Sequence, residues 1–363
     1  MDSIDILKNS TVFPLEEMGH SDIVENSLYP QIAVIGAGSA GCSMVSQLNV
    51  KGIDNVRFAV VDTDMEYLEQ SAVMRKILLQ PTTGEQGMEK AVADNADRIS
   101  AILKDGIQMV FILTGLGGNT GAAIARAISR MTKRKHLLTV MVATLPFHFE
   151  GEKTIRKAIH QSSAIGEYAN ATVLVNNARL PECVADLTFT NAFAMSNRCV
   201  SEIVENSVAL CKNKNALSID IHDLLVFLHD GQATTILTDE ASGHNRISQA
   251  LDKIVASPLN KLAKPYSAQK VLIKIFNSNA PDIALKIGEM DQLKEFMHNF
   301  APDIEVCWSI SIDNSLGEKV RITLLLSQLE LQLEKEFRET YGDEFATEQM
   351  NETTNPETET ELF

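Results

Sequence analysis

The feature that most constrains the fold is a glycine-rich run that directly follows a stretch of apolar residues. Residues 109–113 have the composition of a buried strand, the sequence GLGGNTG follows at 115–121, and a helical pattern begins at Ala122. A strand that ends in glycines and continues into a helix presents backbone N–H groups and a helix N-terminus to an anion. We interpret the run as a phosphate cradle. For this run alone, a flexible turn that merely needs positive φ is an equally good alternative.

Composition excludes several classes of protein. The chain has 363 residues, of which 45% are hydrophobic, enough to build two ordinary domains. A net charge of -16 argues against a nucleic-acid partner, because affinity for phosphate backbones needs clustered cations. No apolar run reaches membrane-spanning length and no signal peptide is visible, so we expect a cytoplasmic protein without direct membrane insertion. The cysteines and histidines lack ligand spacing, so we expect reduced thiols and no metal held by protein side chains.

A second unit of strand, glycines and helix lies nearer the start of the chain. An apolar run at 32–35 is followed by G-x-G-x-x-G at 36–41 and by a helical stretch over 42–50. The next strand, at 58–61, is followed by Asp62 and Asp64. An acid at this distance from the glycines suits a ribose hydroxyl in a dinucleotide enzyme, so these residues alone leave an NAD-dependent oxidoreductase open.

Strands and helices alternate along most of the chain. After a loop at 81–87, we expect helices at 88–104 and 191–212 and strands at 137–144 and 171–175. This alternation predicts a mostly parallel sheet covered on both faces, with a ligand at the carboxyl ends of the strands. Further on, the patterns predict a smaller mixed sheet, with strands at 270–276, 304–312 and 319–326 and helices at 246–256 and 290–298.

The two ends of the chain differ in composition from the rest. Residues 1–30 are polar with isolated apolar positions, and could be a disordered arm or dock a short helix on the core. A helical pattern over 327–339 gives way to the segment 343–363, which is rich in Glu and Thr and has no Lys or Arg. That composition is typical of disorder. The acidic tail could repel neighbouring copies or bind a basic partner.

Several motifs in the expected order make the chain resemble the tubulin and FtsZ superfamily, and FtsZ more closely than tubulin. The sequence GGNTG at 117–121 resembles the family's GGGTG, and residues 36–43 are similar to its first loop. PFHFEG at 146–151 matches the FtsZ pattern PFxFEG, and Ser257-Pro258-Leu259 resembles its SPL. The resemblance implies an α/β fold in which a nucleotide-binding domain with a mostly parallel sheet is joined by a long central helix to a smaller α+β domain with a mixed sheet.

The most informative match is SIDIHD at 218–223, where FtsZ has NxDxxD. Asp220 and Asp223 lie three positions apart at a loop-to-helix junction and could polarise a water. An ordinary helix start, capped by Ser218 or Asp220, is the alternative. In FtsZ-like proteins this loop enters the nucleotide site of the next subunit. The resemblance therefore implies that the two acids complete a hydrolytic site only in a filament.

The resemblance implies GTP or GDP with Mg²⁺ as ligands and further copies of the chain, in a longitudinal homopolymer, as partner. It implies domain boundaries at 31–215, 216–327 and 328–342, the last a C-terminal helix, between an extension at 1–30 and the tail at 343–363. Besides the two acids, the candidate nucleotide-binding residues are Gly36, Gly38, Ser39, Ala40, Gly41, Ser43, Asp62, Asp64, Thr83, Gly84, Gly115, Gly117, Gly118, Asn119, Thr120, Gly121, Glu150, Thr154, Asn177, Phe193, Asn197 and Arg198.

The chain departs from the FtsZ pattern mainly around the base. Arg198 stands where the family has its guanine-reading acid, and a guanidinium has no acceptor for the guanine N–H donors. Thr154 replaces a family arginine, Ser43 an asparagine, and Asn119 a glycine. Two alternatives therefore stay open: a filament-forming GTPase, or a paralogue that binds nucleotide and assembles with little hydrolysis or an altered base preference.

Overall fold

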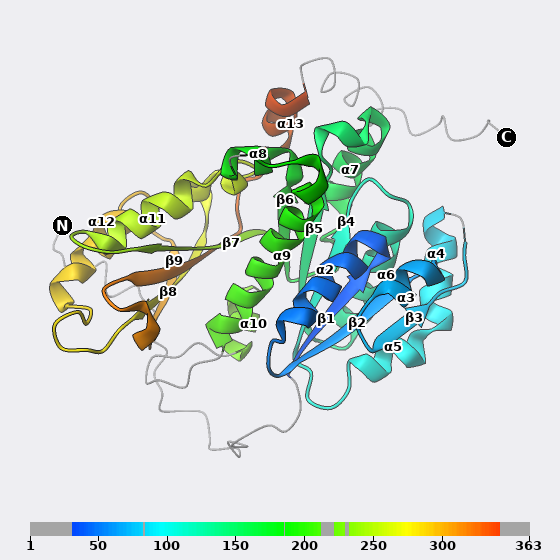
Figure 1. The fold of residues 1–363 in the computed structure, drawn as a ribbon, viewed down its shortest axis with the longest axis horizontal. Coiled ribbons are helices and arrows are strands. Elements are labelled where there is room, and N and C mark those ends of the chain that lie inside the picture. Colours follow the sequence, from blue (N-terminus) through cyan, green and yellow to red (C-terminus); the bar gives the residue numbers. More distant parts are fainter. Residues whose placement is uncertain (1–30, 83, 185, 212–220, 229–231, 342–363) are drawn as a thin grey trace.

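The computed structural model describes residues 31–341, with gaps at 83, 185, 212–220 and 229–231 (Figure 1). Its centre is a ten-stranded sheet with the order β3-β2-β1-β4-β5-β6-β7-β10-β8-β9. The strands are β1 (Ile32–Ala37), β2 (Val56–Asp62), β3 (Arg75–Leu78), β4 (Met109–Gly115), β5 (Leu138–Leu145), β6 (Ala171–Asn176), β7 (Gln232–Ala241), β8 (Lys270–Asn277), β9 (Glu305–Ile312) and β10 (Val320–Ser327). The first seven pair in parallel, β7, β10 and β8 are antiparallel neighbours, and β8 pairs in parallel with β9.

Helices cover both faces of the first half of the sheet. The helices of this half are α2 (Gly38–Lys51), α3 (Met65–Gln70), α4 (Gly84–Asp94), α5 (Ala96–Ile102), α6 (Thr120–Arg134), α7 (Glu152–Ala164), α8 (Leu180–Cys183) and α9 (Phe189–Cys211). Apolar side chains of α4 to α7 form one buried cluster against the sheet, and those of α2 and α9 form another on the opposite face. Ile35 of β1 belongs to the first cluster and Val34 to the second, which explains why the strand is apolar throughout.

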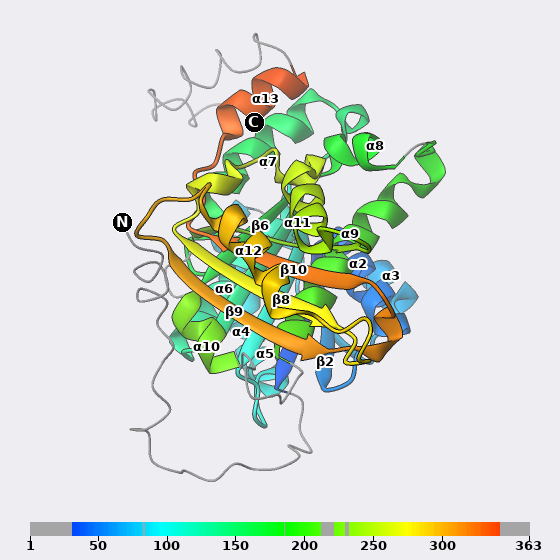
Figure 2. The same cartoon turned by 90° about the vertical axis from the view of Figure 1, so that its left-hand side faces the viewer.

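The second half of the sheet carries its own core. The remaining helices are α10 (Ile221–Phe227), α11 (Arg246–Ala256), α12 (Met290–Met297) and α13 (Leu333–Tyr341). Figure 2 shows α11 and α12 in front of β8 and β10, and their apolar side chains form a third buried cluster. The predicted α/β class is confirmed. The strand β7 was missed, and through two residue pairs with β6 it joins the expected smaller sheet to the larger one.

Two predictions between residues 81 and 104 were wrong. The loop expected at 81–87 becomes helical at Gly84, and the single helix expected over 88–104 is two helices, α4 and α5. Asn95 separates them, because its side-chain amide donates to the carbonyl oxygen of Ala91 at 3.0 Å. This local hydrogen bond competes with continuation of the helix.

Three helix boundaries also differ from the prediction. The helices expected from residues 42 and 122 begin earlier, at Gly38 and Thr120, so both glycine-rich runs extend into helical turns. The helix expected over 328–342 begins at Leu333. Gln328 has a positive φ of 57°, and Leu331 forms an isolated antiparallel bridge with Ala263, so the chain after β10 turns before it becomes helical.

Candidate functional site

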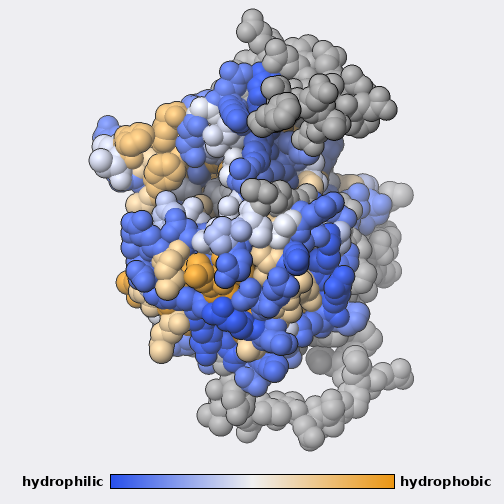
Figure 3. All heavy atoms as spheres, turned by 90° about the vertical axis from the view of Figure 1, so that its right-hand side faces the viewer, coloured by the Kyte–Doolittle hydropathy of each residue, from blue (hydrophilic) through white to orange (hydrophobic). Residues whose placement is uncertain are grey.

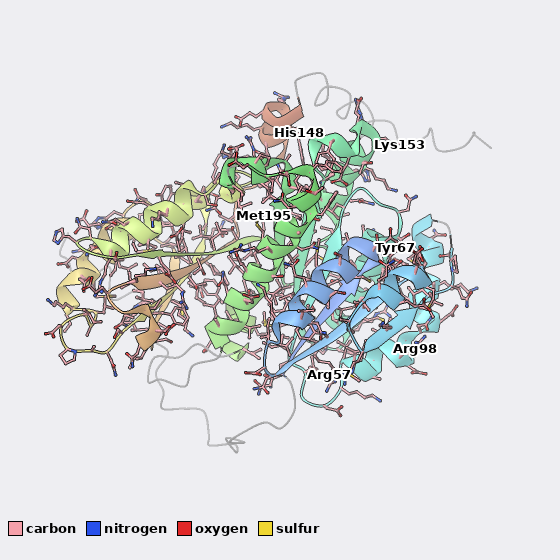
Figure 4. All side chains as sticks on the ribbon, viewed as in Figure 1. Arg57, Tyr67, Arg98, His148, Lys153 and Met195 are labelled. Carbon is pink, nitrogen blue, oxygen red and sulfur yellow. The ribbon has the colours of Figure 1, made fainter. Side chains whose placement is uncertain are left out.

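The predicted site residues of the first half gather at one edge of the sheet. Because β1, β2, β4, β5 and β6 are parallel, their carboxyl ends meet there: Ala37 pairs with Val61 and Thr114, and Leu145 pairs with Asn176. We call this the carboxyl edge, and the opposite one the amino edge. In Figure 4, His148 and Lys153 mark the carboxyl edge at the top and Arg57, at the start of β2, marks the amino edge at the bottom.

The two glycine-rich loops at this edge are packed against each other. A Cβ on Gly38 would lie 2.6 Å from the Cα of Gly121, and Gly38 has a φ of 73°. A Cβ on Gly115 would lie 2.8 Å from the Cβ of Ala40. This close approach places the N-termini of α2 and α6 side by side, where their free N–H groups and dipoles favour a negatively charged ligand.

Gln161 of α7, which the sequence analysis missed, holds the second loop. Its side-chain carbonyl accepts the N–H of Gly117 at 2.8 Å, and its side-chain amide donates to the carbonyl oxygen of Gly118 at 2.8 Å. Thr154 also lies against this loop: a Cβ on Gly117 would be 2.5 Å from its methyl group. Nothing in the local sequence marks Gln161, because it lies more than 40 residues away from the loop.

Asp62 and Asp64 extend the site along the same edge. Asp62 is 3% exposed, and its Oδ1 accepts the N–H groups of Thr63 at 2.7 Å and Asp64 at 3.3 Å. Its Oδ2 has no hydrogen-bond partner among the described residues. Burial raises the pKa of this carboxyl against the opposing effect of the two N–H donors. Asp64 is exposed and caps α3 by accepting the N–H of Glu66.

Beyond β5, the motif PFHFEG forms the short helix η1 (His148–Glu150) and part of an aromatic group. Glu150 accepts the N–H of Phe147 at 2.7 Å, and burial raises the pKa of its carboxyl. The group, which we call the aromatic cluster, has ring centroids 4.7 to 6.0 Å apart and consists of Phe147, Phe149, Phe189 and Phe193. Phe149 is 50% and Phe189 69% exposed, so the cluster puts apolar surface on the carboxyl edge, and Figure 3 shows apolar side chains gathered near this upper end of the molecule.

Each of the three residues expected at the base has a side-chain hydrogen bond to a neighbouring residue. Asn177 accepts the hydroxyl of Ser196 at 2.6 Å, and Asn197 donates to the hydroxyl of Ser43 at 2.9 Å. Arg198 is exposed and donates from Nε to Glu202 at 3.0 Å, one turn further along α9. The guanidinium is thus paired along the helix surface, and its place at the base stays a prediction.

Arg179, also missed from the sequence, ties the C-terminal helix to this end of the site. Its Nε and Nη2 donate to the two carboxylate oxygens of Glu336 at 2.7 and 2.9 Å, and Asn176 donates to the same carboxylate at 2.8 Å. Glu336 is only 2% exposed, and these hydrogen bonds strongly raise the pKa of the guanidinium. The pair fixes α13 on the loop that carries Asn177.

The acids of SIDIHD belong to the other end of the molecule. Asp220 lies outside the described residues, as does Thr83, whereas Asp223 is exposed in the first turn of α10. The helix α9 runs parallel to α2, with Asn197 beside Ser43 at the carboxyl edge and Glu205 paired with Lys51 further down. At about 1.5 Å per residue, the fourteen residues from Asn197 to Cys211 carry the chain roughly 20 Å toward the amino edge. Figure 1 shows α10 at this lower end of α9, so Asp223 lies far from the glycine-rich loops of its own chain.

Of the described residues predicted for the site, all except Asp223 lie at the carboxyl edge. They include Gly36, Ser39, Gly41, Gly84, Asn119 and Thr120. Paired helix N-termini over a parallel sheet, with aromatic and amide side chains beside them, define the class of α/β nucleotide-binding proteins.

Comparison with known proteins narrows this class. The model of the tubulin/FtsZ family GTPase domain matches residues 31–185, and that of the FtsZ family C-terminal domain matches residues 231–330. The chain belongs to the tubulin/FtsZ family. This family has both glycine-rich loops, so the match argues against the alternative of an NAD-dependent oxidoreductase.

Individual relatives are distant. The cell division protein FtsZ of Porphyromonas gingivalis is 29% identical over 331 residues, which cover 88% of this chain and 72% of that protein. A solved empty FtsZ dimer of M. jannaschii is 25% identical, with a TM-score of 0.70 over 82% of this chain and 88% of that chain. CetZ2 of Haloferax volcanii, solved as a GTPγS-bound protofilament, shares the fold with a TM-score of 0.69 at 15% identity, over 90% of this chain and 100% of that chain.

Proposed function

We propose that this protein is a nucleotide-dependent cytoskeletal GTPase that assembles head to tail and hydrolyses GTP at the junction between two copies. The observation that carries the proposal is the separation of the two parts of the candidate site. The glycine-rich loops lie at the carboxyl edge, and Asp223 lies beyond the lower end of α9. One copy cannot bring them together, whereas two copies stacked end to end can.

The phosphates of the nucleotide bind over the N-termini of α2 and α6. The helix dipoles and the N–H groups of Asn119, Thr120 and Gly121 stabilise the negative charge, and Gln161 keeps the second loop in place. The ring of Phe193, which is 47% exposed, is available to stack on the base. Asn197 lies one turn further along α9, and Asn177 bonds to Ser196 of the same helix; both carry amide groups that can hydrogen-bond to the base or ribose.

The residues at the end of β2 fit a divalent cation. Mg²⁺ prefers carboxylate oxygens and usually keeps several waters, and the buried Oδ2 of Asp62 has no partner among the described residues. Asp62 and Asp64 would hold the ion directly or through water, which departs from the expectation from the sequence that no protein side chain holds a metal. When bound, it would neutralise charge on the phosphates.

Hydrolysis requires the second copy. Asp223, with Asp220, enters the site of the copy below, orients a water and accepts its proton as the water oxygen attacks the γ-phosphorus and GDP leaves. The exposed Phe149 and Phe189 of the aromatic cluster lie at the same edge. Apolar surface of this kind favours burial against a partner. The protofilament of CetZ2 provides a precedent for end-to-end assembly in this fold.

A second function is favoured by one observation. Because Arg198 is paired with Glu202 and offers no acceptor, the site lacks the side chain that reads guanine in FtsZ-like proteins. A paralogue with relaxed base preference, or with assembly but slow turnover, would have this site. The choice between the two functions depends on measured turnover and on the ratio of affinities for GTP and ATP.

The test measures phosphate release and pelleting against protein concentration, with Mg²⁺ and either GTP or ATP. We expect a concentration threshold for release, and a loss of about 100-fold or more in turnover for Asp223→Ala, the scale of removing a group that positions the nucleophile. Nucleotide affinity of the isolated Asp223→Ala chain should equal that of the parent, since the residue lies at the other end of the molecule.

The matched control is Asp291→Ala, which removes an acid from the first turn of another helix, α12, away from both edges of the first half. It should leave release and pelleting unchanged. Release that rises linearly from the lowest protein concentration, with no threshold, would rule out a shared site. Pelleting without release in the unmodified chain would favour the second function.

A further inference from the structure

A contiguous run of cations lies at the amino edge of this acidic protein. Lys133, Arg134, Lys135 and His136, which we call the basic run, end α6 and begin the turn into β5. All four are exposed. Within the part of the chain that the structure describes, none of them forms an ion pair, and Lys133 contacts the ring of Tyr168 at 5.7 Å. Cations at a helix C-terminus also suit the dipole, so the run alone assigns no partner.

Two other cations of α6 have partners within the fold. Arg126 is paired with Glu167, and Arg130 is paired with Glu89 at 3.0 Å and stacks on Tyr168 at 4.6 Å. The charge of the upper part of α6 is therefore compensated within the fold. The charge of the basic run is left for solvent or for an anionic partner.

A cavity adjoins the basic run. Its volume is about 790 Å³, and Lys133 and His136 line it together with Tyr168. The rest of the wall is mixed: hydroxyl and amide side chains and Glu167, which is paired with Arg126, alternate with apolar side chains from both halves of the sheet, among them Leu137, Leu174, Leu259, Leu262, Leu329 and Leu331. A ligand that suits this surface combines negative charge with scattered large apolar side chains.

One segment of the chain itself has that chemistry. Residues 343–363 contain seven carboxylate side chains and no Lys, Arg or His, interspersed with Phe345, Met350, Leu362 and Phe363. The segment itself carries seven of the negative charges of this acidic chain, so it favours a cationic surface, and the basic run offers one.

The position of α13 decides which copy the segment reaches. The contacts of Glu336 with Arg179 and Asn176 hold α13 at the carboxyl edge, at the top of Figure 1, so the segment starts at the end opposite to the basic run. A random coil of about 20 residues has an r.m.s. end-to-end distance of roughly 25 Å. The strands of one copy alone have about this length, so the segment would have to extend along its whole subunit to reach the basic run of its own copy. In a head-to-tail pair, the carboxyl edge of one copy meets the amino edge of the next.

We propose that the acidic segment 343–363 of one copy docks on the basic run and the adjoining cavity of the next copy, and so ties successive copies together. This inference rests on the proposed head-to-tail assembly. The segment adds an electrostatic contact to the longitudinal junction, and its tethering to α13 gives it a high effective concentration there.

The first test compares pelleting thresholds of four full-length chains: the parent, Arg134→Glu with Lys135→Glu, a chain with Glu348, Glu352 and Glu357 changed to Gln, and the combination. We expect each set alone to raise the threshold about fivefold at low salt, and the combination to raise it no further, because both remove the same contact. The difference should disappear in about 0.5 M salt, where exposed charges are screened. Lys286→Glu with Lys294→Glu, an equal change of charge at exposed positions around α12, is the control and should leave the threshold unchanged.

The second test asks which copy is contacted. In a Cys183→Ser background, one chain carries Lys135→Cys and a second, of different mass, carries Glu352→Cys. A bismaleimide should give dimers that contain one of each chain, only under assembling conditions. Pellets without mixed dimers, or equal thresholds in all four chains, would refute this inference and leave assembly intact. If the unmodified chain forms no pellet with any nucleotide, the proposed function fails and the inference fails with it.

Discussion

The two ends of the candidate nucleotide site are held by different kinds of contact. At the phosphate end, residues 36–41 and 115–121 shape the site through backbone contacts, with Gly38 against Gly121 and helix N-termini side by side. At the base end, Asn177, Asn197 and Arg198 are held by side-chain partners.

Backbone contacts and side-chain contacts differ in how they respond to a substitution. A Cβ added to Gly38 would lie only 2.6 Å from the Cα of Gly121, so this contact between the two loops leaves no room for a side chain. A side chain at the base end can be exchanged without moving the backbone, provided that its neighbour accepts the new group. We therefore expect substitutions to change the base end of the proposed site more readily than its phosphate end.

The largest effect is expected when the backbone contact is broken. Gly38→Ala places a methyl group against the Cα of Gly121 and requires a side chain at a φ of 73°. We expect nucleotide affinity to fall about 100-fold or more and the free energy of unfolding to fall by roughly 2 kcal/mol. Calorimetric titration with GTP and Mg²⁺, and thermal unfolding without ligand, measure the two effects.

Gly118→Ala is the matched control, because a Cβ at this position meets nothing within 4 Å. Its free energy of unfolding should stay within about 0.5 kcal/mol of the parent. Equal losses of stability in the two variants would show that the loops do not depend on this contact.

A smaller, selective effect is expected at the base end. Arg198→Asp supplies the carboxylate acceptor that the guanine N–H donors lack, so the preference for GTP over ATP should rise about tenfold or more. Dissociation constants for both nucleotides give this ratio. Glu202→Gln, which only removes the partner of Arg198, should leave the ratio unchanged. If Arg198→Asp leaves it unchanged as well, the base does not approach this residue.

The smallest effect concerns Asp62, the phosphate-end side chain whose charge is not compensated. Its pKa is raised on folding, so the folded state disfavours the ionised carboxylate, and stability is lost as pH rises from the ordinary value of 3.8 through the raised one. In the absence of nucleotide and metal, Asp62→Asn should melt a few degrees above the parent at pH 7, and the gap should close as pH falls toward 4. Thermal unfolding across this range measures it.

Asp64→Asn is the control for that experiment, since Asp64 is exposed and asparagine also caps a helix. Its melting temperature should follow that of the parent. A lower melting temperature for Asp62→Asn at pH 7 would mean that the carboxylate has a stabilising partner. With Mg²⁺ and nucleotide present, the parent should gain more stability than Asp62→Asn.

Local sequence was sufficient wherever a pattern acts over a few residues. The buried strands of the first half and α11 lie close to where the apolar patterns predicted them, because strand and helix periodicity is a local property. The glycine-rich loops were recognised for the same reason. The break between α4 and α5 at Asn95 and the turn at Gln328 were not recognised. They depend on a side-chain hydrogen bond and on backbone conformation, which a periodic pattern does not record.

By itself, the sequence determined the fold class, the family and the positions of the two glycine-rich loops, since these follow from the order of short motifs. Only the tertiary structure decided that β7 joins the two sheets, that Gln161 holds the second loop, that Arg179 fixes α13, and that Asp223 lies far from the glycine-rich loops. Each of these facts joins residues that are distant in the chain. Such contacts arise when elements pack against one another, and no local pattern encodes their partners.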